Sequence, residues 1–190
     1  MVTLAPTLYI RTFPRIAGWQ RDLTLIVLGT LFVAILAQVK IPLPFTPIPL
    51  TGQTFAVLLV AAALGSKRGT ASMAFYIVIG AFGLPVFAGG ASGITYLSGA
   101  TLGYLIGFIL AAYVVGLLAE RGLERNIRTS IIPFLVGTVI ICTCGVIWLS
   151  MLLGNFSKAV AAGLTPFLIG DFIKLIAAAL VLPAAWNLAK

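Results

Sequence analysis

Residues 101–119 read TLGYLIGFILAAYVVGLLA and contain no charged side chain. The hydrocarbon core of a bilayer is about 30 Å thick, and a helix needs about 20 mostly apolar residues to cross it. This stretch therefore predicts a membrane-spanning helix. Five further apolar segments predict spans of the same kind and bring the total to six: 23–39, 50–64, 69–84, 131–153 and 166–188.

The overall composition supports a membrane protein. Hydrophobic residues fill 61% of the 190 positions and charged residues only 8%, and the mean hydropathy is +1.17. Soluble domains have about 45–50% apolar and about 25% charged residues, so a soluble enzyme and a disordered chain are excluded. A nucleic-acid-binding protein is also excluded, because such proteins gather basic residues on one face, and here they are scattered despite a net charge of +8. We expect an all-α integral membrane protein embedded in the lipid bilayer.

Lysine and arginine are unevenly distributed between the predicted connections. Because cytoplasmic loops carry an excess of these residues, the pattern predicts that both termini are cytoplasmic. Only Lys40 and Lys158 then lie in outer loops. The predicted inside residues are Arg11, Arg15, Arg21, Lys67, Arg68, Arg121, Arg125, Arg128 and Lys190. Residues 1–22 are interpreted as a cytoplasmic tail, either disordered or with an interfacial helix near 8–19, and residues 23–190 as a six-helix transmembrane domain.

The two long outer connections, 40–52 and 83–99, are rich in glycine and proline and nearly free of charge. Irregular backbone at membrane depth is tolerated where protein buries it or where it lines a cavity. We therefore expect these loops to fold over the bundle and cap a ligand pocket. Rigid connectors without a pocket are the alternative.

Asp171 and Lys174 are the only charged residues inside the predicted spans. Three residues apart on a helix, they share one face and can partly neutralise each other. Ionisable residues within a membrane mark functional sites by default, and one donor beside one acceptor suits a small polar ligand. A structural ion pair that fixes helix packing is the alternative.

Several other polar or small residues allow two interpretations each. Gln53 can cap the second span or line the pocket, and the hydroxyl groups of Tyr76 and Tyr104 can bond a ligand or a backbone carbonyl. Small side chains form two stripes, which favour close helix contact. The stripe of the fourth span is interpreted mainly as internal packing: Gly99, Gly103, Gly107 and Ala111. The stripe of the first span faces either this chain or a partner: Thr30, Ala34 and Gln38.

Some kinds of chemistry lack their usual residues. The chain has no histidine, which is the commonest general base and metal ligand, and we expect no metal site. Cys142 and Cys144 are interpreted as small buried hydrophobes. The sequence contains no G-x-x-x-x-G-K-[ST] phosphate loop, so any ATP-driven step requires another protein.

Four motifs, in this order, resemble the BioY family, the biotin-binding S subunits of energy-coupling factor (ECF) transporters. They are PFTPIPLTGQT at 44–54, GLPVFAGG at 83–90, GYLIGF at 103–108 and DFIK at 171–174. The chain departs from the family pattern in three places. It reads GATLGY at 99–104 where the family has a Gly-Pro-Thr-Gly-Gly-Tyr-like run. Ala91-Ser92 replaces an expected polar residue, and Thr30-x-x-x-Ala34 replaces an A-x-x-x-A docking face.

The resemblance implies a biotin uptake protein of the cell membrane, without enzymatic activity or a cofactor. Lys174 would donate to the ureido carbonyl and Asp171 would accept from a ureido N–H; in the alternative pose the biotin carboxylate meets Lys174. Phe45 and Phe87 would pack on the ring and chain, and the turn at Gly89 and Gly90 would hold the carboxylate. Further binding candidates are Ser92, Gln53 and Tyr104.

The resemblance also implies partner proteins, and two alternative functions remain. A transmembrane coupling (T) subunit and two cytoplasmic ATPases would drive transport, with Thr30 and Ala34 as docking residues. A transporter subunit for another water-soluble vitamin remains as one alternative. An intramembrane enzyme that uses Asp171 and Lys174 as acid and base is the other.

Overall fold

The computed structural model describes residues 3–188, which form a helical bundle with one short β-hairpin. The helices and strands, in chain order, are α1 (Leu4–Thr12), α2 (Gly18–Ala37), β1 (Lys40–Ile41), β2 (Leu50–Thr51), α3 (Gln53–Leu64), α4 (Ser66–Ala81), α5 (Ile94–Leu97), α6 (Leu102–Glu120), η1 (Leu123–Arg125), α7 (Ile127–Leu153), α8 (Phe156–Gly163), η2 (Thr165–Phe167) and α9 (Leu168–Leu188). Lys190, which the sequence predicts to lie inside, falls outside the described residues.

The six predicted apolar segments coincide with α2, α3, α4, α6, α7 and α9, although not all have the expected length. Within residues 3–188, four stretches are long and apolar enough to cross a membrane: Gly18–Ala37, Leu102–Glu120, Ile127–Leu153 and Phe156–Asn187. Helix α3 has 12 residues and so measures only about 18 Å. Its buried residues lie on all sides, because α2, α4, α6 and α9 surround it. A helix enclosed by protein need not match the bilayer thickness.

The N-terminal segment packs on the bundle. Helix α1 ends at Thr12, before Pro14, because proline lacks the N–H that a continuing helix needs and disfavours helical backbone at the residue before it. Leu4 and Pro6 are buried, where α1 contacts α2 and α3. The interfacial helix expected near 8–19 is therefore displaced towards the N-terminus, and α2 starts five residues before the predicted span, at Gly18.

Helices α6 and α7 pack closely through glycines. A Cβ at Gly103 would clash with the Cβ of Trp148 and lie 2.5 Å from the carbonyl oxygen of Cys144. A Cβ at Gly107 would lie 2.9 Å from the Cα of Ile141. The internal-packing interpretation of this stripe is confirmed at both positions. The contact holds α7 against α6 next to the covering segments.

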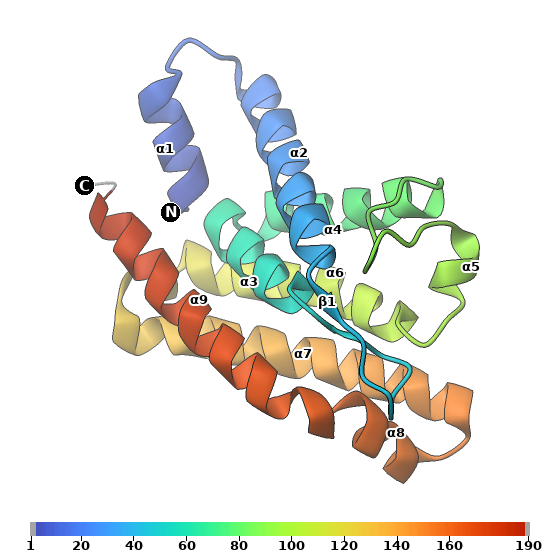
Figure 1. The fold of residues 1–190 in the computed structure, drawn as a ribbon. Helices are drawn as coiled ribbons and strands as arrows, with labels where there is room; N and C mark the ends of the chain where they lie inside the picture. Colours follow the sequence, from blue (N-terminus) through green and yellow to red (C-terminus); the bar gives the residue numbers. More distant parts are fainter. Residues whose placement is uncertain (1–2, 189–190) are drawn as a thin grey trace.

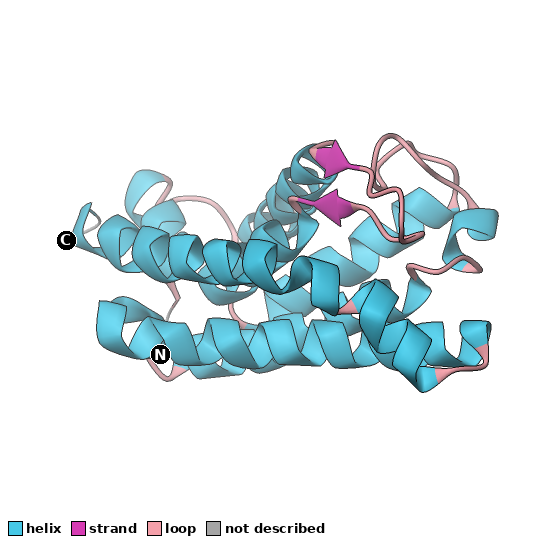
Figure 2. Ribbon diagram, turned by 60° about the horizontal axis from the view of Figure 1, so that its bottom comes forward, coloured by secondary structure: helices cyan, strands magenta, loops and turns pink. Residues whose placement is uncertain are grey.

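Three covering segments lie at the end of the bundle opposite the termini: residues 38–52, 82–101 and 154–167 (Figures 1 and 2). The first pairs Lys40 with Thr51 and Ile41 with Leu50 in an antiparallel hairpin, so the chain is not purely α-helical as expected. Thr46 Oγ1 donates to the carbonyl oxygen of Ala162, 2.7 Å away. This hydrogen bond ties the first segment to the third.

We predict that Gly103→Ala lowers the thermal stability of the detergent-purified protein. The added methyl group has no room between α6 and α7, and overpacking of this kind costs about 1–3 kcal/mol. The measurement is the melting temperature, with Gly18→Ala as the control because a Cβ there meets nothing closer than 3.8 Å. Equal melting temperatures for the two variants would contradict the close α6–α7 contact.

Candidate functional site

A cavity lies between the covering segments and α3, α6, α7 and α9. Its empty volume is about 570 Å³, which includes open solvent at the mouth. The cavity is lined by Ile48, Pro49, Thr51, Gln53, Thr54, Ala88, Tyr96, Thr101, Tyr104, Leu105, Phe108, Ile141, Cys142, Gly163, Phe167, Asp171 and Lys174.

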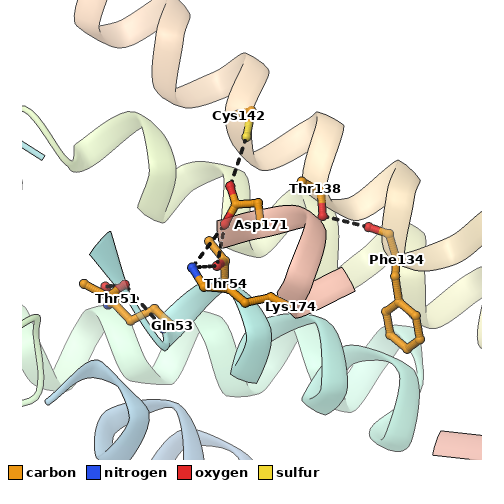
Figure 3. Close-up of polar contacts among 8 residues, drawn as sticks. All are labelled: Thr51, Gln53, Thr54, Phe134, Thr138, Cys142, Asp171 and Lys174. Carbon is orange, nitrogen blue, oxygen red and sulfur yellow. Dashed lines mark hydrogen bonds and ion pairs between the residues drawn. The ribbon is translucent and has the colours of Figure 1, made fainter. Parts of the chain in front are cut away.

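Asp171 and Lys174 meet in this cavity, as the sequence predicts (Figure 3). Lys174 Nζ lies 3.1 Å from Asp171 Oδ1, and the two side chains are only 19% and 11% exposed, respectively. Asp171 belongs to the first turn of α9, where the positive end of the helix dipole favours an anion. The acid and the amine thus meet in the cavity wall, largely shielded from solvent.

Thr54 of α3 is the third member of this cluster. Its hydroxyl group accepts a hydrogen bond from Lys174 Nζ over 3.0 Å and donates to Asp171 Oδ1 over 3.3 Å. The sequence analysis missed Thr54, although it follows Gln53 directly at the start of the same helix. Because α3 and α9 are far apart in the sequence, only the tertiary fold brings this hydroxyl group to the ion pair.

Cys142 of α7 is the second residue that the sequence analysis missed. Its Sγ lies 3.8 Å from Asp171 Oδ2, and it lines the cavity. Both cysteines were interpreted as small buried hydrophobes, but the structure leaves both only partly buried, and the thiol of Cys142 contacts a carboxylate. Cys144, two residues along the helix, instead faces the groove beside Gly103 and Trp148. Both thiols are free.

Gln53 lines the cavity, and its side chain does not cap α3. Its Nε2 donates to the hydroxyl group of Tyr76 over 2.8 Å, and its Oε1 accepts from Thr51 Oγ1 over 3.1 Å. Tyr76 in turn donates to the carbonyl oxygen of Val86, 2.9 Å away. The chain of hydrogen bonds links the first two covering segments to α3.

Of the two roles expected for the hydroxyl group of Tyr104, the structure shows the bond to a backbone carbonyl, and contact with a ligand stays a prediction. Its ring lines the cavity, and its hydroxyl group donates to the carbonyl oxygen of Gly163 over 2.6 Å. Gly163 ends α8, so this bond fastens the third covering segment to α6.

The aromatic candidates in the loops lie outside the cavity lining. Phe87 is fully buried, with its ring edge-on to Tyr76 and stacked on Tyr96 at 4.8 Å between centroids. It therefore supports Tyr96, which lines the cavity. Phe45 is 68% exposed. Direct binding roles for these two residues stay predictions.

The glycine turn lies next to the cavity without lining it. Gly89 and Gly90 adopt left-handed backbone conformations, with φ of 68° and 78°, and their neighbour Ala88 lines the wall. Gly89 N donates to the carbonyl oxygen of Ala37. Ser92 is also outside the lining, and its role and that of the glycine turn stay predictions.

The small-residue stripe of α2 faces α4. Thr30 is fully buried and donates to the carbonyl oxygen of Ser72 over 2.9 Å, and Ala34 is buried too. Gln38 donates to the carbonyl oxygen of Ala34 and, over 3.4 Å, to that of Phe87. In the isolated chain the stripe serves internal packing, and its docking role stays a prediction.

The cluster offers one strong donor and one strong acceptor within an otherwise mostly apolar wall. Ligand pockets of this kind fix the orientation of a ligand with a few polar groups and bury the rest of it on apolar surface. The arrangement suits a small ligand with a carbonyl group beside an N–H on one rigid edge.

Comparisons with known proteins agree on one family. The BioY family profile matches residues 10–190. The chain is 41% identical over 157 residues to the biotin transporter BioY of Thermotoga maritima, covering 83% of this chain and 92% of that protein. It is 35% identical over 161 residues to the probable biotin transporter BioY of Pyrococcus horikoshii, covering 85% and 93%.

A solved structure agrees with these sequence matches. The crystal structure of the S-component for biotin from an ECF-type ABC transporter superposes with a TM-score of 0.80 at 27% identity, covering 90% of this chain and 95% of that one. The fold, the cavity and the matches along nearly the whole sequence lead to one conclusion: the chain belongs to the BioY family.

Proposed function

We propose that this chain is a membrane-embedded S subunit that binds biotin in the cavity around Asp171 and Lys174 and takes part in biotin uptake. The observation that carries the proposal is the buried ion pair, which faces a cavity in a chain 41% identical to a biotin transporter. The family is one of transporter components, so the function is binding and transport, not catalysis.

The polar groups of the cluster match the ureido ring of biotin. Lys174 Nζ has three N–H donors, of which two are directed to Asp171 and Thr54, and the third is available to the ureido carbonyl. Asp171 accepts from a ureido N–H. The bicyclic ring and the valeryl chain then pack on apolar wall residues such as Leu105 and Phe108.

The proposed topology has six crossings with both termini in the cytoplasm. Both chain ends lie at one end of the bundle, and the covering segments lie at the other (Figure 1). The basic connections Lys67–Arg68 and Arg121–Arg128 support a cytoplasmic position for the end with the termini. The cavity would then open to the outside of the cell membrane.

Release of biotin into the cytoplasm requires an energy source that the sequence does not encode. The proposal therefore includes a T subunit and two cytoplasmic ATPases as partners. It is supported by the absence of a phosphate loop from the sequence and by the similarity to a component of an ECF-type ABC transporter.

The first prediction concerns the ion pair. Biotin at 100 times its Kd should stabilise the purified protein by about 2.7 kcal/mol, whereas other water-soluble vitamins should not. The variant Asp171→Asn/Lys174→Met should lose this stabilisation. The double variant is preferred because removing one charge alone leaves its partner buried and unpaired. Unchanged biotin affinity in the double variant would refute the site, and stabilisation by a different vitamin would reassign the ligand.

The pose has its own test. With biotin bound through its ureido ring, Asp171→Asn/Lys174→Met should weaken binding of biotin and of biotinamide, which lacks the carboxylate, by similar factors. A loss confined to biotin would show that the carboxylate meets Lys174.

A third prediction concerns Thr54. Thr54→Val removes a hydrogen-bonding hydroxyl group from two charged groups, and such bonds are worth about 1.5–3 kcal/mol. Biotin affinity measured by calorimetry should fall by about tenfold or more, and Thr54→Ser should restore it. Thr138→Val is the control, because Thr138 bonds only the carbonyl oxygen of Phe134 on its own helix (Figure 3). Equal affinities for the two valine variants would exclude a role for Thr54 in the site.

A further inference from the structure

The two oxygens of the Asp171 carboxylate have donors of different strength. Oδ1 accepts from Lys174 Nζ at 3.1 Å and from Thr54 Oγ1 at 3.3 Å. Oδ2 faces the thiol of Cys142 at 3.8 Å. Figure 3 shows the carboxylate between α7 and the other members of the cluster. One oxygen is therefore held by strong donors and the other only by a weak one.

This difference has a chemical consequence for ligand binding. A thiol is a weak hydrogen-bond donor, whereas an amide-type N–H is a normal one, and bonds to an ionised acceptor are the stronger kind. A ligand N–H that reaches Oδ2 therefore displaces the thiol at little expense. Oδ1, by contrast, is already engaged by a cation and a hydroxyl group, so Oδ2 is the oxygen open to exchange.

We propose that Cys142 is a weak competitor of the ligand for Oδ2: its thiol donates to that oxygen in the empty site and yields it to a ring N–H when the ligand binds. The inference rests on the proposed biotin site and adds a determinant of its specificity. The site then prefers a ligand with a free ring N–H, because this N–H is a stronger donor than the thiol that it replaces. The atom that accepts from the ring N–H is Oδ2.

Two substitutions at this position should have opposite consequences. Serine replaces the thiol by a hydroxyl group, which holds a carboxylate more strongly and competes with the ligand. Alanine removes the competitor and leaves Oδ2 to the ligand. A purely structural role for Cys142 would instead make alanine, with its smaller side chain, the more harmful change.

The test measures biotin affinity by calorimetry for Cys142→Ser and Cys142→Ala. The control is Cys144→Ser, the same substitution at the cysteine that faces the groove beside Gly103. We expect Cys142→Ser to bind biotin about tenfold more weakly, equivalent to one net hydrogen bond. Cys142→Ala and Cys144→Ser should bind biotin at least as tightly as the unaltered chain. Weakening by Cys142→Ala, or no weakening by Cys142→Ser, would overturn the proposal.

A second ligand and a spectroscopic measurement separate competition from a packing effect. For biotin methylated at the ring nitrogen that faces Asp171, the affinity should not differ between Cys142→Ser and the unaltered chain, because no N–H competes for Oδ2. In the Cys144→Ala background, biotin should move the S–H stretching band of Cys142 to higher wavenumber as the thiol loses its acceptor. An unmoved band in protein that binds biotin would overturn the inference alone, whereas failure of the unaltered chain to bind biotin would overturn the proposed function itself.

Discussion

An acid and an amine can remain charged inside an apolar bundle only when each neutralises the other, and this constraint determines the site. Asp171 and Lys174 lie one turn apart on α9 and satisfy it within a single helix. Burial would be costly for either alone. Because the ion pair is assembled locally, the remaining helices need only supply walls and a few hydrogen bonds. Thr54 and Cys142 do this from α3 and α7.

Close helix packing and covering segments give the ion pair its surroundings. The glycine contact of α6 and α7 lets the side chains of Tyr104 and Cys142 reach the same cavity. Tyr104 also bonds the end of α8, and Thr46 bonds the same segment from the hairpin side. The third covering segment is thus joined by hydrogen bonds both to the bundle and to the hairpin segment.

Much of the fold was predictable because its signals are local. Apolar runs located the six main helices, and a four-residue glycine spacing indicated close helix packing along α6, which the structure shows to be with α7. The ion pair was predictable from two charges within an uncharged stretch. Thr54 and Cys142 were not predictable as site residues, because a threonine and a cysteine in apolar helices resemble packing residues until the tertiary fold places them beside a carboxylate. Helix α8 was not predicted either. The short hairpin was missed for a related reason: prolines favour extended backbone but do not reveal which extended segments pair.

The shortness of α3 bears on the route that a bound molecule would follow. Thr54 lies at the second residue of this 12-residue helix, and ten residues remain to its far end, a rise of about 15 Å. The part of α3 beyond Thr54 is thus about half as long as the 30 Å hydrocarbon layer is thick. In the proposed orientation, a molecule that leaves the cavity towards the cytoplasm would pass alongside only a few turns of this helix.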